Sequence, residues 1–206
     1  MDHAIISKLI QEQNKPLPGL ASQKKMMMYN DDAYNPNPPF GKESAVLLNI
    51  YPTSENKVNI IFIERAFSEH SIHSGQISFP GGKKEDTDQN LIETALREST
   101  EEINLQKEEV NIIRPLSPIY IPVSDYKVFP FLSYSMSLPK SLTACPNEVA
   151  KILHFDLGTL LEKEVYTPIK TSYNVNMKVK AYQSGDYVIW GASAMILAEL
   201  EALIKR

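Results

Sequence analysis

Apolar residues fall in short runs of strand length along much of the chain, and turn-forming residues separate these runs. Residues 45–51 and 58–64 flank a Pro-Thr-Ser-Glu-Asn segment, which predicts an antiparallel pair of strands. Pro130 cannot donate a ladder hydrogen bond, so it predicts an edge position or a bulge for its own run. Further strand-like runs, the last two forming a hairpin, lie at 110–114, 128–136, 148–155, 175–182 and 187–190.

Apolar positions recur at helical spacing in three other segments. Residues 5–13 predict a short amphipathic helix, and residues 192–204 predict a strongly apolar closing helix. Between them lies the clearest helical pattern, which gives one buried face. The residues that recur on this face are the apolar Ile92, Ala95, Leu96 and Ile103, together with the small Ser99.

The ends of this central helix carry recognisable signals. Asp86, Thr87 or Asp88 is expected to cap its start, because short oxygen-bearing side chains accept hydrogen bonds from the first helical N–H groups. Asn104 is expected to end it in the left-handed conformation that Gly usually adopts there. The preceding residues 66–87 are predicted to form a long loop that ends in Pro-Gly-Gly.

Strands before and after a central helix, with another helix at the end, predict an α/β fold in which helices cover both faces of a mixed sheet. Residues 14–43 hold five of the prolines and many Asn and Asp residues. This composition predicts irregular surface chain, either an arm laid over the domain or a partly mobile segment. The expected division is therefore an N-terminal helix and arm over 1–43 and one folded domain over 44–206.

Composition excludes several classes of protein. The 206 residues carry a net charge of −4, which gives no support for broad nucleic-acid binding. Cys145 is the single cysteine, so intramolecular disulfides and cysteine zinc sites are excluded. No segment approaches the ~20 apolar residues of a membrane span, and residues 1–4 do not begin a secretion signal. A cytoplasmic protein is expected, and its oligomeric state stays open, with a homodimer among the alternatives.

Three glutamates of the central predicted helix share one face. Glu98, Glu101 and Glu102 follow i, i+3, i+4 spacing, so they stack within one turn. Like charges repel there, and the helix dipole disfavours anions near the C-terminal end of a helix, where these glutamates lie. A solvated acidic face is the commoner explanation, but the poor placement and the Gly81-Gly82 turn favour a bound hard dication such as Mg²⁺. Glycines let the backbone approach, so a carbonyl there could complete the metal's ligands.

Arg97 lies within this acidic segment. It can reach Glu93 or Glu101 one turn away, or Asp88 across the preceding turn. Its expected role is to orient the acidic cluster, with direct substrate contact as the alternative.

The segment from Gly82 to Leu105 resembles the Nudix box, G-x5-E-x7-R-E-U-x-E-E-x-G-U, where U is aliphatic. The matching residues are Gly82, Asp88, Arg97, Glu98, Glu101, Glu102 and Leu105. The chain departs from the motif in four places: Asp88 replaces Glu, one extra residue precedes Arg97, Ser99 replaces an aliphatic residue, and Asn104 replaces Gly. The acidic triplet is intact.

Two runs narrow the resemblance further. Residues 73–82, His-Ser-Gly-Gln-Ile-Ser-Phe-Pro-Gly-Gly, and residues 94–98, Thr-Ala-Leu-Arg-Glu, look like the coenzyme A pyrophosphatase subgroup. That subgroup also carries the extra residue before the arginine. The similarity extends from about residue 44 to 200 and is weak over the first forty.

The resemblance implies a Nudix-type α/β/α sandwich with a mixed sheet between helices, so that 44–206 is a Nudix hydrolase domain. It also implies that water, activated by Mg²⁺ or Mn²⁺, cleaves the diphosphate of a small nucleotide substrate. For the subgroup, coenzyme A or a thioester gives 3′-phospho-AMP and (acyl-)phosphopantetheine. The alternatives are another nucleoside diphosphate derivative, such as ADP-ribose or NADH, and a non-catalytic nucleotide sensor.

The resemblance also assigns roles to individual residues. Glu98 and Glu102 become the principal metal ligands, Glu101 an auxiliary ligand, and the Gly81 carbonyl a further ligand. Glu148, in a Pro-Asn-Glu turn before a predicted strand, is an extra ligand, a general base or a surface carboxylate.

Other residues are candidates for substrate binding, each with a structural alternative. Arg65 can bind a phosphate or form an ion pair, and Lys83 can meet a phosphate or lie in a solvated turn. Gln76 and Ser78 contact the substrate or position their loop. The cluster 26–28 of three methionines lines an apolar groove for a pantetheine or acyl tail, or packs in the core.

Overall fold

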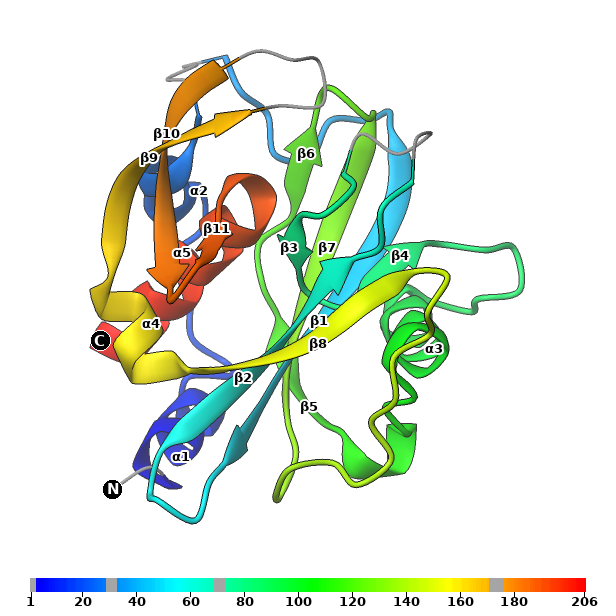
Figure 1. Cartoon of the computed structure of the whole chain (residues 1–206), viewed down its shortest axis with the longest axis vertical. Helices are drawn as coiled ribbons and strands as arrows, with labels where there is room; N and C mark the ends of the chain where they lie inside the picture. Colours follow the sequence, from blue (N-terminus) through cyan, green and yellow to red (C-terminus); the bar gives the residue numbers. More distant parts are fainter. Residues whose placement is uncertain (1–2, 29–32, 69–72, 171–175) are drawn as a thin grey trace.

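The computed structural model describes residues 3–28, 33–68, 73–170 and 176–206. In these ranges the chain forms a large mixed sheet and a smaller antiparallel sheet (Figure 1). Strand β1 pairs antiparallel with β2, which confirms the predicted pair, and parallel with β7. The long strands of the large sheet are β1 (Lys42–Pro52), β2 (Val58–Arg65), β5 (Asn111–Pro115), β7 (Tyr126–Tyr134) and β8 (Val149–Asp156).

Three short strands complete the large sheet, and two of them lie in the segment 66–87 that was predicted to be a loop. These are β3 (Ile77–Ser78), which pairs with β2, and β4 (Gly81–Lys83), which pairs with β1. The third, β6 (Ile119–Ile121), pairs with β7. Strands this short are too brief to show an alternating apolar pattern, so the loop prediction was wrong at these positions.

Helices cover both faces of the large sheet, as predicted (Figure 1). Alternate residues of β1 point to opposite faces. Leu47 packs in the cluster that holds α3 (Leu91–Ile103), whereas Leu48 packs in the cluster that holds α5 (Gly191–Lys205). Helix α1 (His3–Gln11) contributes to the second cluster. No helix in the described part of the chain is both long and apolar enough to cross a membrane.

The central helix begins later than predicted. Its cap is Asn90, whose side-chain oxygen accepts from the N–H groups of Ile92 and Glu93 at 3.0 Å, so the prediction of Asp86, Thr87 or Asp88 was wrong. Asp88 is instead buried and bound to Thr94 and Arg97. Asn104 has φ 53° and ends the helix in the left-handed conformation, as predicted.

Strand β7 lies inside the sheet, although Pro130 predicted an edge or a bulge. It pairs with β1 along one side and with β5 and β6 along the other, so the edge prediction was wrong. Pro130 falls between the residues that pair with β5 and those that pair with β6. The position at which Pro130 lacks an N–H group therefore coincides with the gap between β5 and β6 along this side of β7.

The smaller sheet carries the predicted hairpin, in which β10 (Asn176–Ser184) pairs with β11 (Tyr187–Ile189); residue 175 lies outside the described ranges. Its third strand, β9 (Glu164–Lys170), was not predicted and contains Pro168, which fits an edge position. The N-terminal arm contains short helical elements rather than irregular chain alone. The remaining elements are α2 (Leu20–Gln23), η1 (Lys24–Met26), η2 (Lys107–Glu109) and α4 (Leu157–Glu162).

Candidate active site

Helix α3 places two of its glutamates against the β4 turn. Glu102 is only 1% exposed, and its carboxylate accepts hydrogen bonds from the Gly81 N–H (2.9 Å) and from Arg65 Nη1 (3.2 Å). Glu98 lies one turn earlier, against Gly82: a Cβ on that glycine would lie 2.4 to 2.6 Å from the Glu98 carboxylate atoms. Glycine at this position therefore makes room for the Glu98 carboxylate.

Glu148 joins these two glutamates from a distant part of the chain. One carboxylate oxygen from each of Glu98, Glu102 and Glu148 lies within 4.8 Å of the others. The segment before Glu148 is held to the end of α3, where the Cys145 N–H donates to the Glu102 carbonyl at 2.8 Å. The Thr143 N–H donates to the Ile103 carbonyl at 3.0 Å. Helix carbonyls that would otherwise lack partners thus position the third carboxylate.

The electrostatics of this group favour a bound cation. Burial raises the pKa of Glu102 to about 7, although the Gly81 N–H and Arg65 act in the opposite direction. Burial also raises the pKa of Glu98, against the effect of Arg97. Carboxylates that lie close together are costly to ionise, and a bound dication removes that cost. Their oxygens are also the ligands that Mg²⁺ and Mn²⁺ prefer. The side chains present thus fit a divalent metal ion.

Arg97 connects the acidic helix to the preceding turn. Its Nε and Nη2 donate to the two carboxylate oxygens of Asp88 at 2.9 and 3.0 Å, and Nη2 also donates to the Lys83 carbonyl. Its Nη1 donates to Glu98 at 3.1 Å and to Glu101 at 2.9 Å. The guanidinium also holds the pKa of Asp88 well below its usual range. Arg97 thus links Asp88 to Glu98 and Glu101, and its orienting role stays a prediction.

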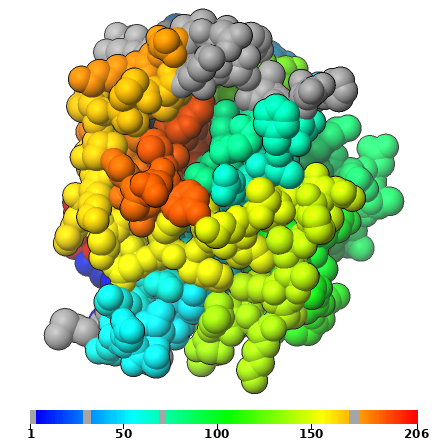
Figure 2. All heavy atoms as spheres, viewed as in Figure 1, coloured from blue at the N-terminus to red at the C-terminus, as the bar shows by residue number. Residues whose placement is uncertain are grey.

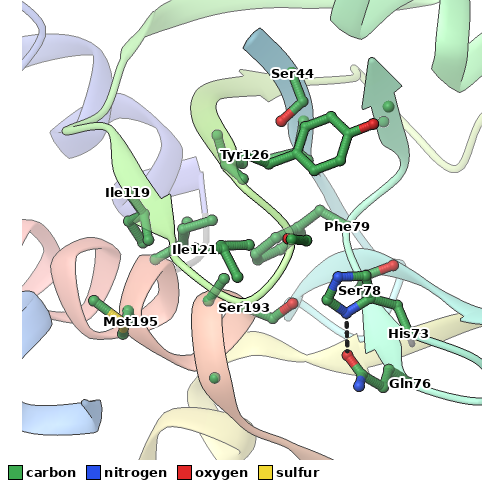
Figure 3. Close-up of a pocket in the computed structure, with 18 of the residues that line it drawn as sticks. Ser44, His73, Gln76, Ser78, Phe79, Ile119, Ile121, Tyr126, Ser193 and Met195 are labelled. Atoms are coloured by element: carbon green, nitrogen blue, oxygen red, sulfur yellow. Dashed lines mark hydrogen bonds between the residues drawn. The ribbon is translucent and has the colours of Figure 1, made fainter. Parts of the chain in front are cut away.

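A cavity of about 570 Å³ lies beside the three glutamates. Figure 2 shows the face on which the β11–α5 region, in orange, lies beside the blue-green residues around β3. The predicted substrate residues Arg65, Gln76, Ser78 and Lys83 all line this cavity. In Figure 3 the side chains of His73 and Gln76 are hydrogen-bonded to each other at its edge.

Comparison with known proteins identifies the family. A model of the NUDIX domain matches residues 42–170, which is more than half of the chain. The chain belongs to the Nudix family. Among its Nudix relatives, the uncharacterised hydrolase NudL of Photorhabdus laumondii is 33% identical over 167 residues, which cover 80% of this chain and 86% of that protein.

A second relative has a named activity. The human mitochondrial coenzyme A diphosphatase NUDT8 is 33% identical over 127 residues, which cover 60% of this chain and 53% of that enzyme. This chain is therefore a member of a pyrophosphohydrolase family and is related to a coenzyme A diphosphatase.

Solved structures confirm the predicted Nudix fold. The Nudix hydrolase RenU from M. smegmatis superimposes with a TM-score of 0.54 at 12% identity, covering 87% of this chain and 91% of that one. A MutT/nudix protein from Enterococcus faecalis gives the same TM-score at 15% identity, covering 96% and 73%. At these low sequence identities, the likeness shows a shared fold and nothing about substrate.

The Nudix-box residues differ in how closely they approach the group of three carboxylates. Glu101 lies outside that group: its side chain is 55% exposed and forms an ion pair with Arg97. Arg65 binds Glu102, so it combines the predicted structural ion pair with a place on the cavity wall. The Gly81 N–H is used by Glu102, and the Gly81 carbonyl stays a predicted ligand.

Several cavity residues were not candidates from the sequence. Ser44 and Tyr126 come from β1 and β7, and Trp190 comes from the turn before α5. Trp190 has intermediate exposure and forms part of the cavity wall. Ser44 and Tyr126 lie far apart in the sequence, and the pairing of β1 with β7 brings them to the same cavity (Figure 3).

Arg97→Lys is expected to destabilise the protein by about 2 kcal/mol, because lysine cannot reproduce the paired hydrogen bonds to Asp88. Chemical denaturation measures this change. Arg206→Lys, at the partly exposed chain end, is the matched control and should change stability by less than ~0.5 kcal/mol. Equal stability of the two variants would contradict the positioning role.

Proposed function

We propose that this chain is a metal-dependent hydrolase that cleaves the diphosphate bond of coenzyme A or its thioesters. The products are 3′-phospho-AMP and (acyl-)phosphopantetheine. The observation that carries the proposal is the meeting of Glu98, Glu102 and Glu148 at a cavity in a Nudix chain. The similarity to a coenzyme A diphosphatase supports this choice of substrate.

Glu98, Glu102 and Glu148 would hold the metal. Mg²⁺ or Mn²⁺, when bound, supplies an activated water and neutralises charge on the diphosphate. The Gly81 N–H and Arg65 fix the Glu102 carboxylate, and Arg97 fixes Glu98. Glu148 is exposed and closest to solvent, so it serves either as the third ligand or as the base that accepts a proton from the attacking water.

The substrate-binding residues supply the hydrogen bonds and the positive charge that a diphosphate ester needs. Arg65 and Lys83 are the cationic side chains among the described residues that line the cavity. The Ser78 hydroxyl is buried and has no hydrogen-bond partner among the described residues. A buried polar atom without a partner costs free energy, and a ligand atom at this wall would remove that cost. Gln76 stands beside it on the same wall.

The proposal predicts a specific pattern of products. Purified protein with Mg²⁺ or Mn²⁺ should convert coenzyme A to 3′-phospho-AMP and phosphopantetheine, and excess EDTA should reduce turnover to background. Dephospho-coenzyme A, ADP-ribose and NADH are the competing substrates, and mass spectrometry identifies the cleaved bond. Faster turnover of ADP-ribose or NADH than of coenzyme A would contradict the substrate assignment. Nucleotide binding without turnover of any compound would contradict catalysis and favour a sensor.

The cytoplasmic location stays a prediction, and the oligomeric state stays open, with a homodimer among the alternatives. Size-exclusion chromatography with light scattering tests the second, since a 23.3 kDa chain gives clearly different masses as a monomer and a dimer.

A further inference from the structure

One wall of the cavity is built by parts of the chain that lie outside the matched NUDIX domain. Met27 and Met28 come from the N-terminal arm, and two residues come from helix α5. Strand β6 completes this wall. Figure 3 shows its labelled members on the side of the cavity opposite His73 and Gln76. The apolar wall, as we call it, consists of Met27, Met28, Ile119, Ile121, Met195 and Ile196.

The arm is fixed to the fold before it reaches this wall. The carboxylate of Glu199 in α5 is fully buried and accepts hydrogen bonds from the Gly19 N–H (3.0 Å) and Gln23 Nε2 (3.1 Å). It also accepts from the N–H (3.1 Å) and hydroxyl (2.7 Å) of Ser117. A buried carboxylate is costly unless its oxygens are paired, so these bonds hold the arm, α5 and the β5–β6 connection in one arrangement.

A second anchor holds the arm after the methionines. The Tyr34 hydroxyl donates to the Tyr120 carbonyl and accepts from the Tyr120 N–H, both at 2.9 Å. It thus satisfies backbone groups of β6, a strand that lines the cavity. With anchors on both sides, the placement of Met27 and Met28 at the cavity is a feature of the fold.

The chemistry of the apolar wall suits an uncharged alkyl group. The cationic side chains among the described lining residues, Arg65 and Lys83, belong to β2 and β4 on the metal side. Methionine is flexible and polarisable, and it adapts to chains of different shape. Val123 lines the cavity and is 52% exposed, and Phe40, outside the lining, is 59% exposed and packs edge-to-face on the lining residue Tyr120. Apolar surface therefore continues from the cavity toward solvent.

We propose that the apolar wall binds the acyl chain of a coenzyme A thioester, and that Met28 determines the preference for acylated over free coenzyme A. This inference rests on the proposed function and goes further, because it assigns the thioester as the favoured form. Met28 lines the cavity but does not belong to the described core clusters, whereas Met26 is fully buried. Met28 is therefore the arm residue best suited to contact a ligand without supporting the core.

The first test compares octanoyl-coenzyme A with coenzyme A. The wild-type protein should show a kcat/KM ratio of at least about ten in favour of the octanoyl form, since each buried methylene adds to binding. Met28→Gln should lower this ratio about fivefold or more, because the amide places polar atoms against the chain. Met136→Gln is the matched control on a residue that is 74% exposed and outside the cavity lining, and it should leave the ratio unchanged. Circular dichroism checks that both variants fold. A ratio near one, or an unchanged ratio in Met28→Gln, would overturn the proposal.

The second test needs no catalysis. Trp190 is the single tryptophan of the chain and lines the cavity, so its fluorescence reports occupancy. In EDTA, octanoyl-phosphopantetheine should bind at least about tenfold more tightly than phosphopantetheine, and Met28→Gln should reduce this difference. If octanoyl-phosphopantetheine binds more tightly but coenzyme A is not hydrolysed, the proposed function fails while the acyl-binding proposal for the apolar wall is supported. If hydrolysis occurs and the two ligands bind equally, the apolar-wall proposal fails alone.

Discussion

Glu102→Gln is expected to lower kcat for diphosphate cleavage by about a thousandfold or more while the chain still folds. The amide cannot supply the charge that a dication needs, although it can still accept the hydrogen bond from the Gly81 N–H. The matched control is Glu108→Gln, on an exposed glutamate just beyond α3, and it should keep wild-type activity. Near-normal turnover of Glu102→Gln at saturating Mg²⁺ would contradict the metal assignment.

The same variant should alter how stability depends on pH. Burial raises the pKa of Glu102 from 4.5 to about 7, so the folded state holds a proton that the unfolded state has already released. Metal-free wild-type protein should therefore lose stability as the pH rises from about 4.5 through 7, by a contribution on the order of 3 kcal/mol. Glutamine does not titrate, so Glu102→Gln should gain stability relative to wild type over that interval.

Thermal unfolding of both proteins in EDTA, at several pH values between 5 and 8, measures this difference. Mg²⁺ should then stabilise the wild type more than the variant, because a ligand that binds only the folded state raises its stability. If the difference in stability between wild type and Glu102→Gln did not change across the pH range, the raised pKa of Glu102 would be contradicted.

The sequence predicted the long elements because their patterns are local. Helix α3 repeats its apolar face over several turns, and the β1–β2 pair surrounds a turn-rich segment. The cap of α3 could not be chosen from the pattern, since Asp86, Thr87, Asp88 and Asn90 all have suitable side chains. The carboxylate of Asp88 instead binds Arg97 across the turn, and the side chain of Asn90 caps the helix.

The convergence of carboxylates at the candidate site could be predicted where the residues share one helix, and less well where the fold brings them together. Glu98 and Glu102 follow from helical spacing. Glu148 was left with three alternatives because its approach depends on the Cys145 N–H bonding the Glu102 carbonyl. The cavity walls from the arm and α5 depend on the buried Glu199, whose partners lie far away in the sequence. No periodicity encodes such contacts.

Adjacent glycines of β4 should respond in opposite ways to the same substitution. A Cβ on Gly81 would lie 2.2 Å from the Ala45 carbonyl, and Gly81 has φ +145°, which side chains rarely adopt. The backbones of Gly81 and Ala45 cannot move apart without separating β4 from β1. Gly81→Ala should therefore destabilise the fold by about 3 kcal/mol or more, or prevent folding altogether.

Gly82→Ala should instead spare the fold and impair catalysis. Its Cβ would meet the carboxylate of Glu98 at 2.4 to 2.6 Å, and that carboxylate is the free end of a flexible side chain. The carboxylate can therefore turn away at little cost in stability, but it leaves the group it forms with Glu102 and Glu148. A displacement of about 1 Å in a catalytic group commonly costs about a hundredfold in rate.

Thermal unfolding and Mg²⁺-dependent kinetics of the two alanine variants separate these effects. Gly82→Ala should unfold within a few degrees of the wild type, with kcat reduced about a hundredfold and a higher Mg²⁺ concentration needed for half-maximal rate. Full activity in Gly82→Ala would mean that the Glu98 carboxylate does not need its observed position. Loss of folding in Gly82→Ala would mean that the clash falls on the backbone rather than on the side chain. A stable, active Gly81→Ala would contradict the close packing of β4 on β1 that places the Gly81 N–H against Glu102.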